Sequence, residues 1–440
     1  MIVRSRPLTT PHAQSHPQRR KACATRMLGA TVVWGLLWTG RAVAVPPLPP
    51  ADAIARAVDA APEVRAARAR AVEAGFGARL VAMSPYDWVA SGSSARRRID
   101  SEGRFGEWST ALERQVRWPG KATVDQRLGA LQVDQASAEL SSVLRQTRVT
   151  VLEAWFACLQ AAERARLLDN DLEYLAELTR VIEKRRRAGD LAELDEALAT
   201  AELATASAET ATARTDAINA ARLLATRLDD TSCSIANWDS PDPQTVVSIR
   251  PPSTEAQLSA DPAVRASIAA AERARVAAQR ARLERWPDPT LGVTYGRERG
   301  GAERIGGLSV SVPIGVGRRR TEAARAEAAA NAASADLDVA RADALRLQLQ
   351  VESERLRAHQ AWRSLADADR QQRRAIALSG RAFELGETSL AESLVVRRAA
   401  LQTRLAERSA ALDAWRADAI QATFVAAQDH GAAPQTQPTQ

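Results

Sequence analysis

Hydrophobic residues recur at helical spacing through two long segments of the chain, and neither segment contains a proline. The first runs from Ala122 to Ala188 and the second from Glu322 to Leu385. Leucine, tryptophan and isoleucine recur at mostly helical intervals in the first and alanine in the second, with polar and charged residues between them. At 1.5 Å per residue, each segment predicts a helix about 100 Å long. Such lengths indicate coiled-coil packing rather than a compact globule.

Four shorter helical segments accompany the long ones. They run over Pro62–Ala82, Leu191–Arg227, Pro262–Arg285 and Ser389–Val425. Two short helices stacked end to end would match one long helix in length, so the chain predicts four parallel rods. Small alanine side chains suit the close approach of such rods, while charged positions face water.

Two pairs of short alternating segments interrupt this helical pattern. In the second pair, one face is apolar (Leu291, Val293, Tyr295, Leu308, Val310, Val312) and the other is small and polar (Gly292, Thr294, Gly296, Gly307, Ser309, Ser311). In the first pair, the strand from Trp108 to Val116 alternates in the same way, except that Arg114 interrupts its apolar face, and the strand from Trp88 to Arg96 is weaker.

Such alternation is typical of transmembrane barrel strands, although a small soluble sheet with one solvated face also produces it. The lengths favour the barrel, because each run is close to the 9 to 11 residues that a tilted membrane strand needs. Four strands cannot close a barrel alone, and open edges are not tolerated in lipid. Three chains would supply twelve strands, and the unpaired strand edges predict an oligomer.

The whole arrangement occurs twice, about 200 residues apart. The copies open at Ala61-Pro62-Glu63-Val64 and Asp261-Pro262-Ala263-Val264, and each long helix ends at a tip glycine, Gly189 or Gly386. The strand pairs end in turns at Pro119, Gly120 and Lys121 in the first copy and at Pro313 in the second. We therefore predict a first repeat over residues 45–228, a proline-bearing connector over 229–260, a second repeat over 261–428 and a disordered tail over 429–440.

Residues 1–44 have the features of a secretory signal peptide. They carry seven basic residues and no acidic one, followed by an apolar stretch from Met27 to Trp38 and an Ala42-Val43-Ala44 cleavage site. A membrane anchor is the alternative, but about twelve apolar residues fall short of the roughly 20 that span a bilayer. Removal of this segment takes the net charge of +7 to near zero. A nucleic-acid partner is therefore not expected.

The sequence offers little chemistry for catalysis or for a resident metal. After the signal peptide only Cys158 and Cys233 remain, too few for a disulfide framework, and the histidines His359 and His430 belong to no ligand cluster. Nucleophile-elbow, zinc-protease and phosphate-loop motifs are absent from the sequence. We therefore expect no catalytic residues, no cofactor and no bound metal.

In the order, spacing and duplication of these motifs, the chain resembles the TolC-like outer membrane efflux proteins from Asp52 to about Val425. The Trp118-Pro119-Gly120-Lys121 turn is most similar to the heavy-metal cation branch, the CzcC/CusC type. The resemblance implies a trimer with a twelve-stranded outer membrane barrel that continues into a long periplasmic helical barrel. It also implies a periplasmic adaptor and a proton-driven, RND-type inner-membrane pump as partners, and lipid of the outer membrane around the barrel.

The family pattern also implies a gate at the periplasmic tip. Six residues past each tip glycine it places Asp195 and Glu392, and three residues before the second glycine it places Phe383 where tyrosine is expected. A ring of such acids would favour cations at the entrance. One alternative is that both acids only complement the helix dipole in the first turn of a helix. Another is that the neighbouring acids Asp190, Glu193 and Glu387 form the ring instead.

Three functions therefore stay open at this point. The first is a passive efflux conduit for heavy-metal cations or small toxic compounds, the second an outer membrane channel for type I protein secretion, and the third a periplasmic coiled-coil scaffold. The sequence does not identify the cargo, because selection in such systems would lie largely in the pump.

Overall fold

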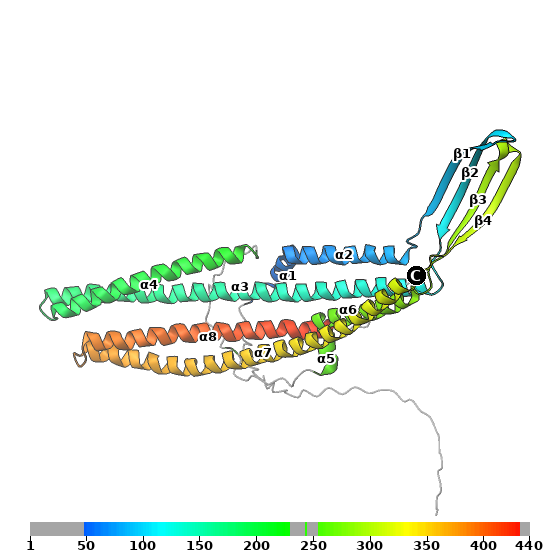
Figure 1. Ribbon diagram of the computed structural model, residues 1–440. Coiled ribbons are helices and arrows are strands. Elements are labelled where there is room, and N and C mark those ends of the chain that lie inside the picture. Colours follow the sequence, from blue (N-terminus) through cyan, green and yellow to red (C-terminus); the bar gives the residue numbers. More distant parts are fainter. Residues whose placement is uncertain (1–47, 229–242, 244–253, 432–440) are drawn as a thin grey trace, which may run out of the picture. The chain divides into compact units, whose positions relative to one another are not determined.

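The computed structural model describes residues 48–228, 243 and 254–431. Figure 1 shows the elements. The first repeat contains α1 (Ala51–Ala60), α2 (Pro62–Ala82), β1 (Trp88–Ile99), β2 (Gly103–Gln115), α3 (Lys121–Arg187) and α4 (Glu193–Ala225). The second contains α5 (Glu255–Ala260), α6 (Pro262–Leu283), β3 (Thr290–Glu298), a 3₁₀ turn (Arg299–Gly301), β4 (Glu303–Ser311), α7 (Gly317–Glu384) and α8 (Leu390–Gly431). The prediction of a mainly helical chain with a small four-stranded part and two repeats is confirmed.

Local sequence explains where the long helices end. Gly189 and Gly386 adopt left-handed φ angles of 86° and 75°. The residue after each glycine donates its amide to a carbonyl five positions earlier, from Asp190 to Arg185 and from Glu387 to Ala382. This is the Schellman arrangement, in which a glycine stops a helix without steric strain. The two predicted tip turns are therefore real helix ends.

The helices pack lengthwise in a fixed order. The short helices α2 and α4 both lie along α3, while α6 and α8 both lie along α7. This agrees with the prediction that two short helices stack end to end beside each long one. The two repeats meet because α3 also packs against α6 and α8. One edge of the bundle is therefore formed by α2 and α4, and the opposite edge by α7.

The core between these helices is assembled from large and small apolar side chains. Its largest cluster contains Trp155, Phe156 and Leu159 of α3 with Leu412 and Trp415 of α8. A neighbouring cluster consists mostly of alanines that pack against Trp362 (Ala358, Ala410, Ala411, Ala414, Ala417). Small residues let the α7 and α8 backbones approach closely, as the alanine pattern indicated.

The four strands form one antiparallel sheet in the order β1-β2-β3-β4. Leu112 of β2 lies opposite Val293 of β3, which lies opposite Leu308 of β4. The edge strand β1 follows α2, and the edge strand β4 precedes α7. The edges of the sheet therefore continue into the edges of the helical bundle. One open edge belongs to α2 and β1, and the other to β4 and α7.

Two short helices were not predicted. The segment over α1 was not assigned as a helix, although Ile54 and Val58 bury against Leu152 of α3. Helix α5 lies inside the predicted connector, most of which is outside the described residues. The predicted signal peptide and most of the predicted tail lie outside them too, and α8 includes the first three residues of that tail.

Several single features complete the description. Cys158 is buried in α3 and is disulfide-bonded. His359 is also buried, and its Nε2 lies 3.0 Å from Asp418 Oδ2, so it belongs to the packing of α7 against α8. None of the described helices is long and apolar enough to cross a membrane.

Candidate channel elements in the sheet, joints and tips

One face of the sheet is apolar and exposed; we call it the apolar face. The strand register places Leu112, Val293 and Leu308 in one row and Leu291 and Val310 in the next. Leu308 retains 86% of its accessible surface. Such a row of exposed large side chains costs free energy in water, about 25 cal/mol for each Å² left uncovered. The apolar face therefore needs a covering that a single chain does not provide.

Aromatic side chains lie at both ends of this apolar region. Trp108 and Tyr295 make an edge-on contact at the end nearer the hairpin loops, with ring centroids 5.9 Å apart. Trp118 and Trp286 stack near the helices, again at 5.9 Å. All four are exposed.

The opposite face of the sheet is small and polar; we call it the small-residue face. A Cβ on Gly292 would come within 2.4 Å of the Ser309 hydroxyl and 2.8 Å of Glu113, so any larger residue would force these side chains to move. Farther along, Arg97 reaches Glu107 at 3.2 Å and Glu298 at 3.3 Å. This face is therefore suited to contact with water.

Arg114, which interrupts the apolar face in the sequence, is accommodated at the helix end of the sheet. Its Nε donates to the carbonyl of Tyr86 at 3.2 Å, and its guanidinium lies over the ring of Trp88 at 5.3 Å from the centroid. A cation over an indole face is a favourable contact. The interruption thus shares the row of Leu291 and Val310, the row of the apolar face nearest the helices.

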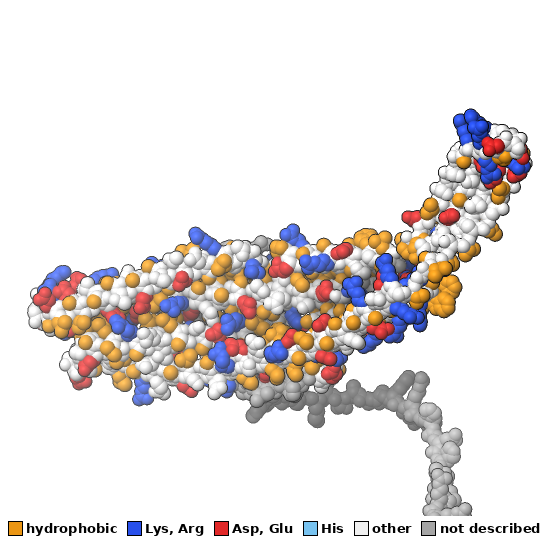
Figure 2. All heavy atoms as spheres, viewed as in Figure 1, with side chains coloured by type: hydrophobic (Ala, Val, Ile, Leu, Met, Phe, Trp, Pro, Cys, Tyr) orange, Lys and Arg blue, Asp and Glu red, His pale blue; other side chains and the backbone are white. Residues whose placement is uncertain are grey.

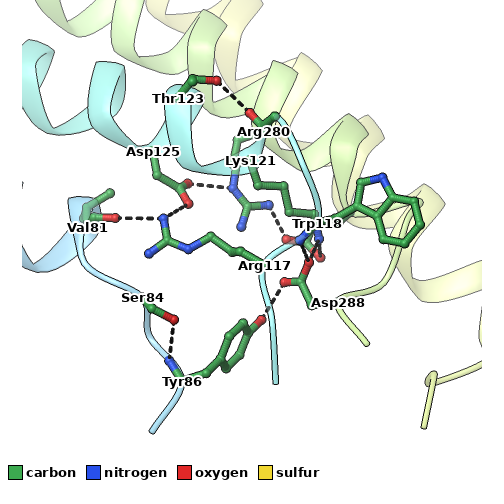
Figure 3. A network of polar contacts seen from close by, with 12 residues as sticks. Val81, Ser84, Tyr86, Arg117, Trp118, Lys121, Thr123, Asp125, Arg280 and Asp288 are labelled. Atoms are coloured by element: carbon green, nitrogen blue, oxygen red, sulfur yellow. Dashed lines mark hydrogen bonds and ion pairs between the residues drawn. The ribbon is translucent and has the colours of Figure 1, made fainter. Parts of the chain in front are cut away.

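A buried lysine fixes the connection between the sheet and the helices (Figure 3). Lys121 has no exposed surface, and its Nζ lies 2.9 Å from Asp288 and 3.1 Å from Glu284. Asp288 also accepts hydrogen bonds from the Trp118 amide at 2.7 Å and the Tyr86 hydroxyl at 2.6 Å. We call these five residues the internal joint. They come from the segments that enter β1, leave β2 and enter β3.

A second ion pair network braces the internal joint from the helix side. Asp125 of α3 accepts from Arg117 at 2.8 Å and from Arg280 of α6 at 2.6 Å. Arg117 also donates to the Val81 carbonyl at 3.4 Å. The left-handed Gly120, with φ of 88°, allows the chain to turn into α3 between these contacts. The predicted turn at Pro119, Gly120 and Lys121 is thus tied to the second repeat.

The internal joint shifts two pKa values in opposite directions. Burial and the Asp288 carboxylate raise the pKa of Tyr86 to about 12. Burial opposes ionisation of Asp288, but the Tyr86 hydroxyl, the Trp118 amide and the Lys121 ammonium outweigh it and hold its pKa below the ordinary value. Asp288 is therefore ionised and Tyr86 neutral throughout the physiological range.

The corresponding turn of the second repeat, residues 312–317, lies at the β4 edge and has a different character; we call it the edge joint. Ile314 is 98% exposed, and Val312 and Val316 are exposed as well. Arg319 donates to the carbonyl of Pro313 at 3.2 Å. No second layer covers this apolar turn within the described chain.

The predicted gate acids cap the helices that follow the tips. Glu392 accepts from the Ser389 amide at 3.0 Å, and the Ser389 hydroxyl accepts from the Glu392 amide at 3.2 Å, which is a complete capping box. Asp195 accepts from the Ala192 amide at 3.3 Å, and alanine offers no side chain in return. The sequence signal for this cap is the spacing Ser389-x-x-Glu392, which is that of a capping box.

Phe383 packs into a small cluster that holds the two tips together. The cluster contains Ile182 of α3, Ala199 of α4 and Leu390 of α8. Just behind it, Arg397 of α8 pairs with Asp171 of α3 at 2.6 Å. The structure therefore brings Phe383 close to the helix start that Glu392 caps, in a part of the molecule where both repeats meet.

The described residues contain no group of three or more histidine, cysteine or acidic side chains arranged to hold a metal ion.

Solved structures with the same fold are outer membrane channels. CmeC from Campylobacter jejuni matches with a TM-score of 0.69 at 15% identity, over 86% of this chain and 85% of that one. VceC from Vibrio cholerae matches at 0.68 and 18%, over 86% and 95%, and CusC at 0.64 and 16%, over 86% and 91%. No protein-family model and no curated protein matches the sequence. At these identities the likeness shows a TolC-like channel fold, and CusC is not favoured over the other two.

Proposed function

We propose that this chain is the outer membrane channel of a tripartite efflux system, in which three copies form a passive conduit. The observation that carries the proposal is the sheet. It has two open edges and an exposed apolar face. The helices connected to its edge strands also lie at the edges of the bundle, α2 on the side of β1 and α7 on the side of β4.

Lipid contact accounts for the features of the sheet that water does not. The apolar face would be covered by acyl chains, while Trp108, Tyr295, Trp118 and Trp286 would lie at the two membrane interfaces, where aromatic residues are enriched. The small-residue face would line a water-filled lumen. The open strand edges then require partners, because unpaired backbone groups are not tolerated in hydrocarbon.

Three copies would pair all of these open edges through one type of contact, repeated between each copy and the next. The β4 edge of one copy would pair with the β1 edge of the next, giving twelve strands, and α7 would meet the neighbouring α2 and α4. Helix α2 presents an exposed apolar stripe at Val72, Phe76 and Leu80, at helical spacing along this edge. A cyclic, head-to-tail interface of this kind closes when the rotation matches.

The remaining parts of the system follow from the same proposal. Residues 1–44 would direct export, and the tips at Gly189 and Gly386 would meet a periplasmic adaptor that links the channel to an RND-type inner-membrane pump. Heavy-metal cations or small toxic compounds are the proposed cargo. Support for the metal branch comes from the Pro119-Gly120-Lys121 turn alone.

Cell fractionation separates this function from its first rival. The channel should sediment with the outer membrane, require detergent for extraction and run as a heat-sensitive trimer. A periplasmic scaffold would instead be released by osmotic shock. Planar bilayers should show discrete conductance steps from the purified protein, and their absence from folded trimer would contradict the proposal.

Gene deletion separates efflux from protein secretion. If the protein is an efflux conduit, cells that lack its gene should lose tolerance to a panel of cobalt, zinc, cadmium, copper and dyes. If it is a type I secretion channel, these cells should keep their tolerance, and a secreted protein should disappear from the culture medium.

The gate is the finer part of the proposal, and its test must separate charge from capping. Glu392→Gln keeps an acceptor for the Ser389 amide but removes the charge, so the helix start should persist. If three copies of Glu392 ring the entrance, this variant should be blocked less by divalent cations or conduct more. Asp195→Asn is the matched change in the first repeat. Unchanged conductance and block in both variants would remove these acids from the gate.

A further inference from the structure

Arginines gather at the loop end of the sheet, and the strand register sorts them by face. Figure 2 shows basic side chains concentrated there. The apolar face continues past Trp108 into five arginines: Arg96 and Arg98 of β1, Arg104 of β2, Arg297 of β3 and Arg304 of β4. Arg297 lies opposite both Trp108 and Arg304, and Arg98 lies opposite Arg104. Alternate positions on the same strands belong to the small-residue face.

The two faces differ in how their arginines are paired. On the small-residue face, Arg97 contacts both Glu107 and Glu298. On the apolar face, the described carboxylates form no ion pair with Arg96, Arg104, Arg297 or Arg304, and Arg98 reaches only the highly exposed Asp100, at 3.8 Å. The buried Nε of Arg297 has no hydrogen-bond partner among the described groups. These five side chains thus form a cationic collar in which four arginines have no carboxylate partner among the described residues.

The collar lies at the depth where anionic headgroups are found in the proposed membrane. The Trp108–Tyr295 contact lies where it begins along the strands, and aromatic side chains of this kind lie at the boundary between acyl chains and headgroups. The collar begins with Arg297 and Arg304 in the row of Trp108 and extends toward the loops by two further rows, each about 7 Å from the last, where the same face enters the headgroup layer. The collar is on the lipid side of the sheet and not on the lumen side.

We propose that this collar binds the phosphate groups of glycolipids in the outer leaflet of the outer membrane. Guanidinium groups suit the task because they bind phosphate with two parallel hydrogen bonds and remain charged. The five positions span all four strands, so bound glycolipid would join neighbouring strands across the sheet. The inference rests on the proposed function, since it requires the sheet to lie in that membrane.

The test compares two triple variants of the full-length protein that lose the same charge. The collar variant carries Arg104→Gln, Arg297→Gln and Arg304→Gln. The control carries Arg65→Gln, Arg325→Gln and Arg374→Gln, three exposed helix arginines with no described ion pair. Native mass spectrometry of detergent-purified trimer measures binding of bisphosphorylated lipid A and of the same lipid without its phosphates.

Wild type and control should prefer the phosphorylated lipid at least about tenfold, and the collar variant should lose that preference. Replacing the three collar arginines with lysine should restore part of the preference, since lysine returns the charge but cannot form the two parallel hydrogen bonds of a guanidinium. Equal preference in wild type and collar variant, or none in wild type, would overturn the inference. If the wild type forms conducting trimers yet shows no preference, the inference alone fails; if it forms no membrane channel, the proposed function fails with it.

Discussion

The internal joint and the edge joint are the same turn in two repeats, yet they are built in opposite ways. At the internal joint, Lys121 is fully buried between Asp288 and Glu284, and Tyr86 and Trp118 complete the contacts. At the edge joint, Ile314 is almost fully exposed among other apolar residues. The difference follows from position, because β2 has neighbours on both sides and β4 has one.

This contrast indicates which turn is covered within one chain and which turn is left uncovered. The first repeat's turn is closed by residues of the second repeat, 163 to 167 positions later in sequence. The second repeat's turn has no third repeat to close it. A neighbouring copy would supply the missing elements, since its α2 and β1 would lie beside β4 and α7 after a rotation.

The largest expected effect tests the internal joint. Lys121→Met should lower the free energy of unfolding by about 3–5 kcal/mol, because it leaves the buried Asp288 without its cation. Arg319→Met, the matched loss of a cation at the edge joint, should cost less than about 1 kcal/mol, since Arg319 donates to a neutral carbonyl and not to a buried carboxylate. Urea unfolding of detergent-solubilised protein measures both. Equal losses would show that the two joints do not differ as described.

The next effect tests the edge joint in the assembled state. Ile314→Asp should weaken assembly by about 2 kcal/mol per copy or more, because an apolar contact would be replaced by a desolvated charge. The fraction of heat-sensitive trimer on unheated gels reports the change, with Ile314→Leu as the control. A trimer fraction equal to wild type in Ile314→Asp would place this turn in water instead of at an interface.

A smaller effect tests the hydrogen bond from Tyr86 to Asp288. Tyr86→Phe should cost about 1.5–3 kcal/mol at neutral pH, the usual value for a hydrogen bond to a charged group. The lowered pKa of Asp288 means that its stabilisation is present above the ordinary carboxyl pKa and is lost as the pH falls through the folded value. The raised pKa of Tyr86 acts at the other end, with stability lost as the pH rises through about 12.

Unfolding measured from neutral to acidic pH checks this sign. The gap between wild type and Tyr86→Phe should narrow in acid, since protonated Asp288 no longer offers a charged acceptor. A gap that stays constant or widens would show that Asp288 is not the group responsible.

The smallest effect concerns the two tips, which differ at one capping position. Ala192→Ser should raise stability by roughly 0.5–1 kcal/mol, because it would complete the box that Asp195 half forms. Ser389→Ala should lose a similar amount in the second repeat. Thermal unfolding of both variants provides the comparison, and no change in either would mean that the caps contribute nothing measurable there.

Much of the fold was predictable because its signals are local. Pro62 and Pro262 mark helix starts, Gly189 and Gly386 mark helix ends, and alternation in Leu291–Tyr295 marks a strand. Helix α1 was missed because it is short and follows a proline-rich stretch, so its apolar residues had too few turns to establish a period.

The joints were not predictable because their contacts are not local. Lys121 belongs to a turn that the sequence predicts, but nothing in the sequence pairs this lysine with Asp288, a carboxylate 167 residues away. The collar needed the strand register as well, since a shift of one residue would move every arginine to the other face. Asp195 and Glu392 lie in the first turns of their helices, and their role at the entrance stays a prediction.

The central claim is that three copies close one another's open edges, and the mass of the membrane-extracted particle tests it most directly. Native mass spectrometry of protein released from the outer membrane in mild detergent should give three copies per particle, with little monomer before heating. A monomer that stays in solution without detergent would contradict the account.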